Sequence, residues 1–100
     1  MALTKILIQR KIKPGAETEF KRIMREVLSG AAHADGFISG ETLQSIDDPT
    51  VHVTISQWKD VSSWDAWINS AERKKKQEEY DKILAEPMKI MALQYEWRYK

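Results

Sequence analysis

Apolar and polar positions along this chain follow patterns that separate strands from helices. Residues 3–12 are rich in β-branched side chains and end at Pro14-Gly15, which predicts a strand followed by a turn. Glu17 and Glu19 come next, and acidic side chains favour the first turn of a helix. A single apolar stripe at helical spacing then follows, made up of Phe20, Ile23, Met24, Val27, Leu28 and Ala31.

The middle of the chain has the pattern of a hairpin. Residues 37–46 alternate loosely between apolar and polar, and residues 51–58 alternate strictly. The turn signal Asp47-Asp48-Pro49 lies between them. Because this connection is short, we expect the two strands to pair antiparallel.

The last part of the chain has helical segments and one more strand. Asp60, Ser62 or Ser63 is expected to cap a short helix, and Ser70 to cap a further helical stretch through Leu84. Met88 to Tyr99 is predicted to be the last strand. The order β-α-β-β-α-β is typical of the ferredoxin-like split-βαβ fold. We therefore predict one α+β domain over residues 1–100, a four-stranded antiparallel sheet with its helices on one face.

Both faces of the predicted sheet carry apolar residues. In the first strand Leu3 and Leu7 alternate with Ile6 and Ile8, and the last strand is apolar on both phases: Ile90 and Ala92 on one, Met91, Leu93, Tyr95, Trp97 and Tyr99 on the other. An exposed apolar sheet face usually marks an interface. We expect a second copy to cover it, so that two sheets pack face to face in a homodimer. Loops or the C-terminal residues are the alternative cover.

Composition narrows the possible functions. The net charge is +1, so electrostatics favour neither nucleic acid nor an anionic membrane as a partner. The chain has no cysteine, which excludes disulfides, thiol nucleophiles and cysteine-ligated metals and is compatible with the cytoplasm. The first residues, MALTKILIQRK, lack the apolar core of a signal peptide, and no apolar run has the length of a membrane span.

Three of the four tryptophans lie within ten positions, where a strand is predicted to meet a helix. Trp58 ends the strand, and Trp64 and Trp67 share one face of the helix. Core packing is the simpler interpretation for each of them. As a group they favour an apolar cavity between helix and sheet, because ligand pockets are mostly apolar. Tyr80 lies further along and is a candidate to line the same pocket; a side chain that points to the solvent is the alternative.

Candidates for acid-base or metal chemistry are few. His52 alternates onto the face of Thr54, Ser56 and Trp58 and could act as an acid or base near neutral pH. A histidine with structural contacts only is the alternative. His33 at the end of the first helix is interpreted as structural, and the two histidines make a weak case for a metal. The basic run Arg73–Lys76 precedes Glu78 and Glu79, a spacing that predicts a solvated helix face.

Three segments resemble a known family. They are ILIQRKIKPGAETEF, GFISGETLQSIDDPTVHVTISQWKD and SSWDAWINSAER. Together they resemble the antibiotic biosynthesis monooxygenase (ABM) domain of the dimeric α/β-barrel superfamily. The resemblance covers nearly the whole chain and implies two split-βαβ subunits that pack their sheets into one barrel. It also implies that Trp67 occupies the position of the family's pocket tryptophan.

The resemblance implies an oxygenase that needs no metal or flavin and acts on an electron-rich aromatic such as a quinol or anthrone. Haem-degrading members use an Asn on the first strand and a His about ten residues after the pocket tryptophan. This chain has Ile8 or Gln9 and Gln77 there. No cofactor is therefore expected, haem included. Two alternatives remain open: a dimeric small-ligand-binding or sensing module without catalysis, and an isomerase or lyase of the same superfamily.

Overall fold

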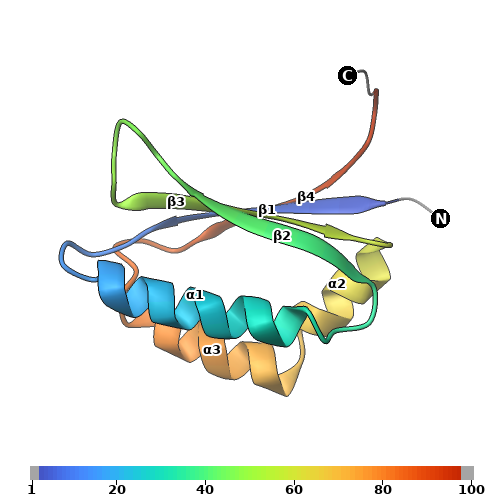
Figure 1. Cartoon of the computed structure of the whole chain (residues 1–100), viewed down its shortest axis with the longest axis horizontal. Helices are drawn as coiled ribbons and strands as arrows, with labels where there is room; N and C mark the ends of the chain where they lie inside the picture. Colours follow the sequence, from blue (N-terminus) through green and yellow to red (C-terminus); the bar gives the residue numbers. More distant parts are fainter. Residues whose placement is uncertain (1–2, 98–100) are drawn as a thin grey trace.

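Three helices cover one face of a four-stranded antiparallel sheet (Figure 1). The computed structural model describes residues 3–97, and within them no helix covers the opposite face. The elements are β1 (Thr4–Lys11), α1 (Glu17–Ala31), β2 (Phe37–Gln44), β3 (Val51–Trp58), α2 (Val61–Ile68), α3 (Ala71–Asp81) and β4 (Lys89–Gln94).

The sheet has the strand order β2-β3-β1-β4, with every neighbouring pair antiparallel. Strand β1 lies in the centre, where Thr4 is opposite Trp58 of β3 and Gln94 of β4. This arrangement confirms the predicted α+β class and the split-βαβ order. It also confirms that the second helical region is divided in two, with α2 ending at Ile68 and α3 beginning at Ala71.

Some strand ends differ from the prediction. Strand β2 ends at Gln44 rather than Ile46, and β4 ends at Gln94. The reason for β4 is its single partner: β1 begins at Thr4, directly opposite Gln94, so pairing stops there. Tyr99, placed in the last strand from the sequence, lies outside the described residues.

The core lies between α1 and the sheet. Phe20, Ile23, Val27 and Ala31 are buried along one side of α1, as the helical spacing predicts. The sheet contributes alternate residues of its central strand, Ile6 and Ile8, which are at most 4% exposed. Each fully buried aliphatic or aromatic side chain of this kind contributes about 1.5–3 kcal/mol. The α1–β1 contact is therefore a main source of stability.

Strand β3 is unusual in the polarity of its two faces. His52, Thr54 and Ser56 are buried on the side of the helices, whereas Val53 and Ile55 are only half-buried on the open side. On that open side Ile55, Leu7 of β1 and Met91 of β4 are direct neighbours across the sheet. A strand that covers a core normally places its apolar residues inward. In β3 three of the four buried side chains on the side of the helices are polar, Trp58 being the apolar one, and the side that faces away from the helices carries Val51, Val53 and Ile55.

Helices α2 and α3 begin at side-chain caps. Asp60 accepts a hydrogen bond from the backbone N–H of Ser63 at 2.8 Å, and Ser70 accepts one from the N–H of Arg73 at 3.2 Å. Such caps contribute about 1 kcal/mol each by satisfying otherwise unpaired amides. They fix where each helix starts. The Asp60 cap therefore orients Trp64 and Trp67 toward the sheet.

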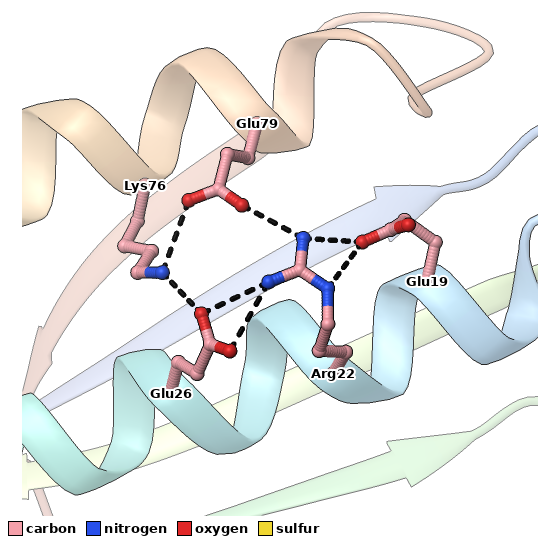
Figure 2. Close-up of polar contacts among 5 residues, drawn as sticks. All are labelled: Glu19, Arg22, Glu26, Lys76 and Glu79. Atoms are coloured by element: carbon pink, nitrogen blue, oxygen red, sulfur yellow. Dashed lines mark hydrogen bonds and ion pairs between the residues drawn. The ribbon is translucent and has the colours of Figure 1, made fainter.

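A network of charged side chains joins α1 to α3 (Figure 2). Arg22 contacts Glu19 and Glu26 on its own helix and Glu79 on α3, at 2.8 Å for Glu79. Lys76 completes the network through Glu26 and Glu79. These groups lie at the surface, so salt screens their attraction.

The spacing of the basic run Arg73–Lys76 predicts that all of it is solvated, and this prediction is wrong for Arg73. Lys74 and Lys75 are exposed, but Arg73 is only 1% exposed. The i,i+4 spacing is compatible with a solvated face, yet Arg73 lies on the side of α3 that faces the sheet. Helix rotation, set by packing of Tyr80 into the core, decides which basic residue is buried.

Candidate functional site

A cavity of about 30 Å³ lies between the helices and the sheet. A water molecule needs roughly 10–15 Å³ measured in this way, so the space is that of about two waters. Its aromatic lining comprises Phe37, Trp58, Trp64, Trp67 and Tyr80. Aliphatic residues of β1 and α1 complete the apolar part: Ile8, Met24, Val27, Leu28 and Ala31.

The structure places the four predicted pocket residues at this cavity: Trp58, Trp64, Trp67 and Tyr80 all line it. They come from β3, α2 and α3, three elements that meet only in the folded chain. Trp58 is 1% exposed, and its indole N–H donates to Ser56 Oγ at 3.0 Å. The rings of Trp58 and Trp64 meet edge to face, with centroids 5.8 Å apart. Trp58 is thus both core and cavity lining.

Two buried arginines also line the cavity, and the sequence analysis identified neither as a site residue. Arg10 comes from β1 and is 2% exposed; its Nη1 donates to Thr54 Oγ1 at 3.2 Å. Arg73 comes from α3, and its Nη1 donates to Gln77 Oε1 at 3.1 Å. Among the described residues neither guanidinium makes an ion pair with a carboxylate.

Tyr80 packs against both arginines. Its ring centroid lies 4.2 Å from Cζ of Arg10 and 5.5 Å from Cζ of Arg73. Burial is the main cause that lowers the pKa of Arg10 to about 10; Tyr80 opposes this shift, and the nearby Arg73 charge adds to it. Burial also lowers the pKa of Arg73 and raises the pKa of Tyr80. At neutral pH the site therefore holds two cations beside a neutral phenol.

His52 does not line this cavity. It lies in a neighbouring groove of about 190 Å³ between α1 and β2, where its ring packs on Phe20 with centroids 4.4 Å apart. The buried Nε2 of His52 has no hydrogen-bond partner among the described residues. Burial lowers the pKa of His52, so the imidazole is neutral at pH 7.

The groove and the cavity share one lining residue. Met24 of α1 lines both spaces. Beside it, Thr42 of the groove and Thr54 of the cavity are joined by a hydrogen bond of 2.9 Å. Methionine is unbranched and adapts easily to a change in the shape of its surroundings. Met24 is therefore a shared wall of the two spaces, one lined by His52 and the other by the tryptophans.

The neutral state of His52 should make stability depend on pH. Below its ordinary pKa of 6.5 the unfolded chain takes up a proton before the folded chain does, so the free energy of unfolding should fall as the pH drops from 6.5. Urea titrations between pH 7 and pH 5 measure this fall. In His52→Gln the free energy of unfolding should fall less over that pH range than in the wild type. His33→Gln, at the exposed histidine, is the control and should leave the contribution of His52 in place. An unchanged pH dependence in His52→Gln would contradict the assignment.

No group of three or more His, Cys, Asp or Glu residues within positions 3–97 is arranged to hold a metal ion. In the same part of the chain no helix is both long enough and apolar enough to cross a membrane. The polar groups at the cavity are instead the two guanidiniums, Thr54 and Ser56. This arrangement can hold an apolar ring and, beside it, a group that carries negative charge or accepts hydrogen bonds.

Known proteins share this fold. SnoaB, a cofactor-independent oxygenase from Streptomyces nogalater, superposes with a TM-score of 0.88 at 13% identity, over 98% of this chain and 97% of that one. A conserved protein from Methanosarcina mazei Go1 gives a TM-score of 0.87 at 20% identity, over 93% of this chain and 92% of that one. At these identities the likeness concerns the fold alone.

Sequence comparison is more specific. The 42.8 kDa protein of the whiE locus of Streptomyces coelicolor is 25% identical over 68 residues, which are 68% of this chain. The match spans only 17% of that relative's length. The family model described as antibiotic biosynthesis monooxygenase matches residues 4–79, which include every element from β1 to most of α3. The chain therefore belongs to the ABM family.

Proposed function

We propose that this protein is a monooxygenase that oxidises a small electron-rich aromatic, such as a quinol or anthrone, with O2 and without a metal or organic cofactor. Family membership supports the reaction class. The observation that carries the proposal is the cavity, where aromatic side chains from four elements, β2, β3, α2 and α3, surround a space that hydrogen-bond donors also line. Apolar surroundings with few fixed polar groups are typical of small-molecule sites.

The reaction needs three things from the protein. An enolisable substrate loses a proton, its carbanion reduces O2, one oxygen atom stays on the carbon and the other leaves as water. The protein must exclude water, stabilise the enolate oxygen and accept the proton. Trp58, Trp64 and Trp67 would exclude water. Arg10, which lines the cavity, would donate to the enolate oxygen, since a preorganised cation in a dry site stabilises developing negative charge.

We propose His52 as the proton acceptor, reached when Met24 moves. Two observations support this role: the lowered pKa keeps the imidazole neutral, and its Nε2 is unpartnered. The groove beside His52 supplies the volume that the 30 Å³ cavity lacks for a bicyclic ring. The substrate would therefore enter from the groove, with its ring between Met24 and the tryptophans.

Oxygen uptake tests the proposed reaction. Metal-stripped protein should consume O2 with anthrones or quinols. Trp67→Ala should lower kcat/KM by roughly 10- to 100-fold, because burial of a large apolar group contributes about 1.5–3 kcal/mol. Trp67→Phe is the control and should retain much of the activity. His52→Ala should lower kcat more than it raises KM. Absence of uptake across a broad panel of enolisable phenols would contradict the proposal.

One observation favours a second candidate, a binding or sensing module without catalysis. The residues that line the cavity include no carboxylate and no imidazole, and the cavity as folded has the size of about two waters. Such a module would bind an aromatic compound without turnover, and His52→Ala would leave binding unchanged. Turnover under anaerobic conditions would instead indicate an isomerase or lyase.

We also propose a homodimer that buries the open face of the sheet. The support is the inverted polarity of β3 and the contiguous apolar side chains of Leu7, Ile55 and Met91 on that face. Sedimentation should give twice the chain mass of 11.6 kDa at micromolar concentration. Ile55→Glu should shift the protein to monomer. Ile46→Glu, at a residue that is 97% exposed outside the sheet, is the control. A stable wild-type monomer would contradict the dimer.

A further inference from the structure

The two positive charges at the cavity have no ion-pair partner among the described residues. Arg10 and Arg73 are 2% and 1% exposed, and neither has a carboxylate within ion-pair distance. A buried charge is costly unless it is paired and hydrogen-bonded. Two like charges beside one another increase that cost. Packing alone therefore does not account for two buried arginines at this place.

The hydrogen bonds of the two guanidiniums are also incomplete. A guanidinium offers five N–H donors. Nε of Arg10 and Nη2 of Arg73 are buried and have no acceptor among the described residues. Both side chains line the same cavity. The unused donors thus belong to residues at one small space, where an acceptor with several oxygen lone pairs would satisfy them.

Tyr80 does not supply the missing negative charge. Its ring lies against both guanidiniums and holds them by cation–π contact. Burial raises its pKa, so the phenol is neutral at pH 7. Thr54 and Gln77, which accept from Arg10 and Arg73, are neutral as well. The groups that hydrogen-bond to the two guanidiniums or stack on them are therefore uncharged. Asp81 acts on Arg73 without an ion pair: Gln77 Nε2 donates to Asp81 Oδ1 at 2.8 Å, and the charge of Asp81 raises the pKa of Arg73 against the larger effect of burial.

We propose that Arg10 and Arg73 form an anion-binding site and that the ligand of this protein is an aromatic acid, with an ionised carboxylate or phenolate at the arginines and its ring against the tryptophans. This inference rests on the proposed function, since it takes the cavity to be the ligand site. Planar anionic oxygen groups match the donors of arginine, and these charge-assisted hydrogen bonds are among the strong ones. The anionic group fits the cavity as folded, and the ring takes the space opened by Met24.

Calorimetric titration with 1-naphthoate and its neutral analogue 1-naphthamide tests this inference. Naphthoate should bind about 10- to 100-fold more tightly, the range expected for hydrogen bonds to a charged group. Arg10→Gln and Arg73→Gln should each remove most of this preference. Arg25→Gln, which removes an exposed arginine of α1, is the control and should keep it. Acetate should bind far more weakly than naphthoate, because it has no ring.

Several outcomes would overturn the inference. Equal affinity for naphthoate and naphthamide, or a preference that survives in both arginine variants, would show that the arginines do not select an anion. Acetate binding as tightly as naphthoate would indicate a site for small anions rather than aromatic acids. If Arg10→Gln does not fold, the preference for naphthoate over naphthamide in Arg73→Gln and Arg73→Lys tests the role of the arginines. The comparison of the two ligands on the wild-type protein needs no variant.

The two proposals can fail separately. Oxygen uptake with neutral quinols, together with no preference for naphthoate, would support the proposed monooxygenase activity and contradict the anion-binding site. Arginine-dependent binding of naphthoate without any oxygen uptake would support the anion-binding site and contradict the proposed monooxygenase activity.

Discussion

Trp58→Ala is expected to lower the free energy of unfolding by about 3–5 kcal/mol, the range for removing a buried aromatic side chain. The ring is 1% exposed and packs against Phe37 and Trp64, with centroids 5.3 and 5.8 Å away. The free energy of unfolding of natural domains is about 5–15 kcal/mol, so the expected loss ranges from about a fifth of the total to all of it. Urea unfolding followed by circular dichroism measures the change.

Trp58→Phe is the matched control. It keeps an aromatic ring in the core but removes the indole N–H that donates to Ser56. The expected loss is about 1–2 kcal/mol, from the smaller volume and the lost hydrogen bond. If Trp58→Ala cost less than Trp58→Phe, Trp58 would not be a core residue. The Trp58→Phe variant thus measures what the smaller ring and the lost indole hydrogen bond cost, and the further loss in Trp58→Ala measures the contribution of the remaining ring.

Gly36→Ala is expected to cost about 2–4 kcal/mol, from backbone strain and a steric clash together. Gly36 has a φ of +86°, and an added Cβ would lie 2.2 Å from Ser63 Oγ and 2.5 Å from Ser63 Cβ. Ser63 is the residue whose N–H and hydroxyl both donate to Asp60. Its displacement would disturb the start of α2 and with it Trp64 and Trp67. Urea unfolding and ligand titration should therefore both change.

Gly15→Ala isolates the backbone contribution. Gly15 has nearly the same φ, +84°, but an added Cβ would meet no atom within 4 Å. Its cost should be only the roughly 1–2 kcal/mol of a left-handed conformation. The difference between the two variants then measures the clash with Ser63. Equal costs would show that the chain near Gly36 relaxes freely.

The predicted site was incomplete for a physical reason. Trp58, Trp64, Trp67 and Tyr80 could be proposed from the sequence because large aromatic residues near a strand–helix junction are few. Arg10 and Arg73 could not, because each lies in a run of polar residues whose pattern predicts exposure. One signal was available for Arg10: it continues the phase of Ile6 and Ile8, which is the buried side of β1.

Strict periodicity was enough to determine the helix Glu17–Ala31 and the strand Val51–Trp58, because local spacing alone defines which residues share a face. It also showed that both sheet faces carry apolar residues. It could not decide that β3 places its polar side toward the helices, since alternation is the same for either orientation. Only the tertiary structure decided that orientation, through the pairing of β3 with β1 and β2. The same packing brings Arg10 and Arg73, 63 positions apart in the printed sequence, to one cavity and separates His52 from it.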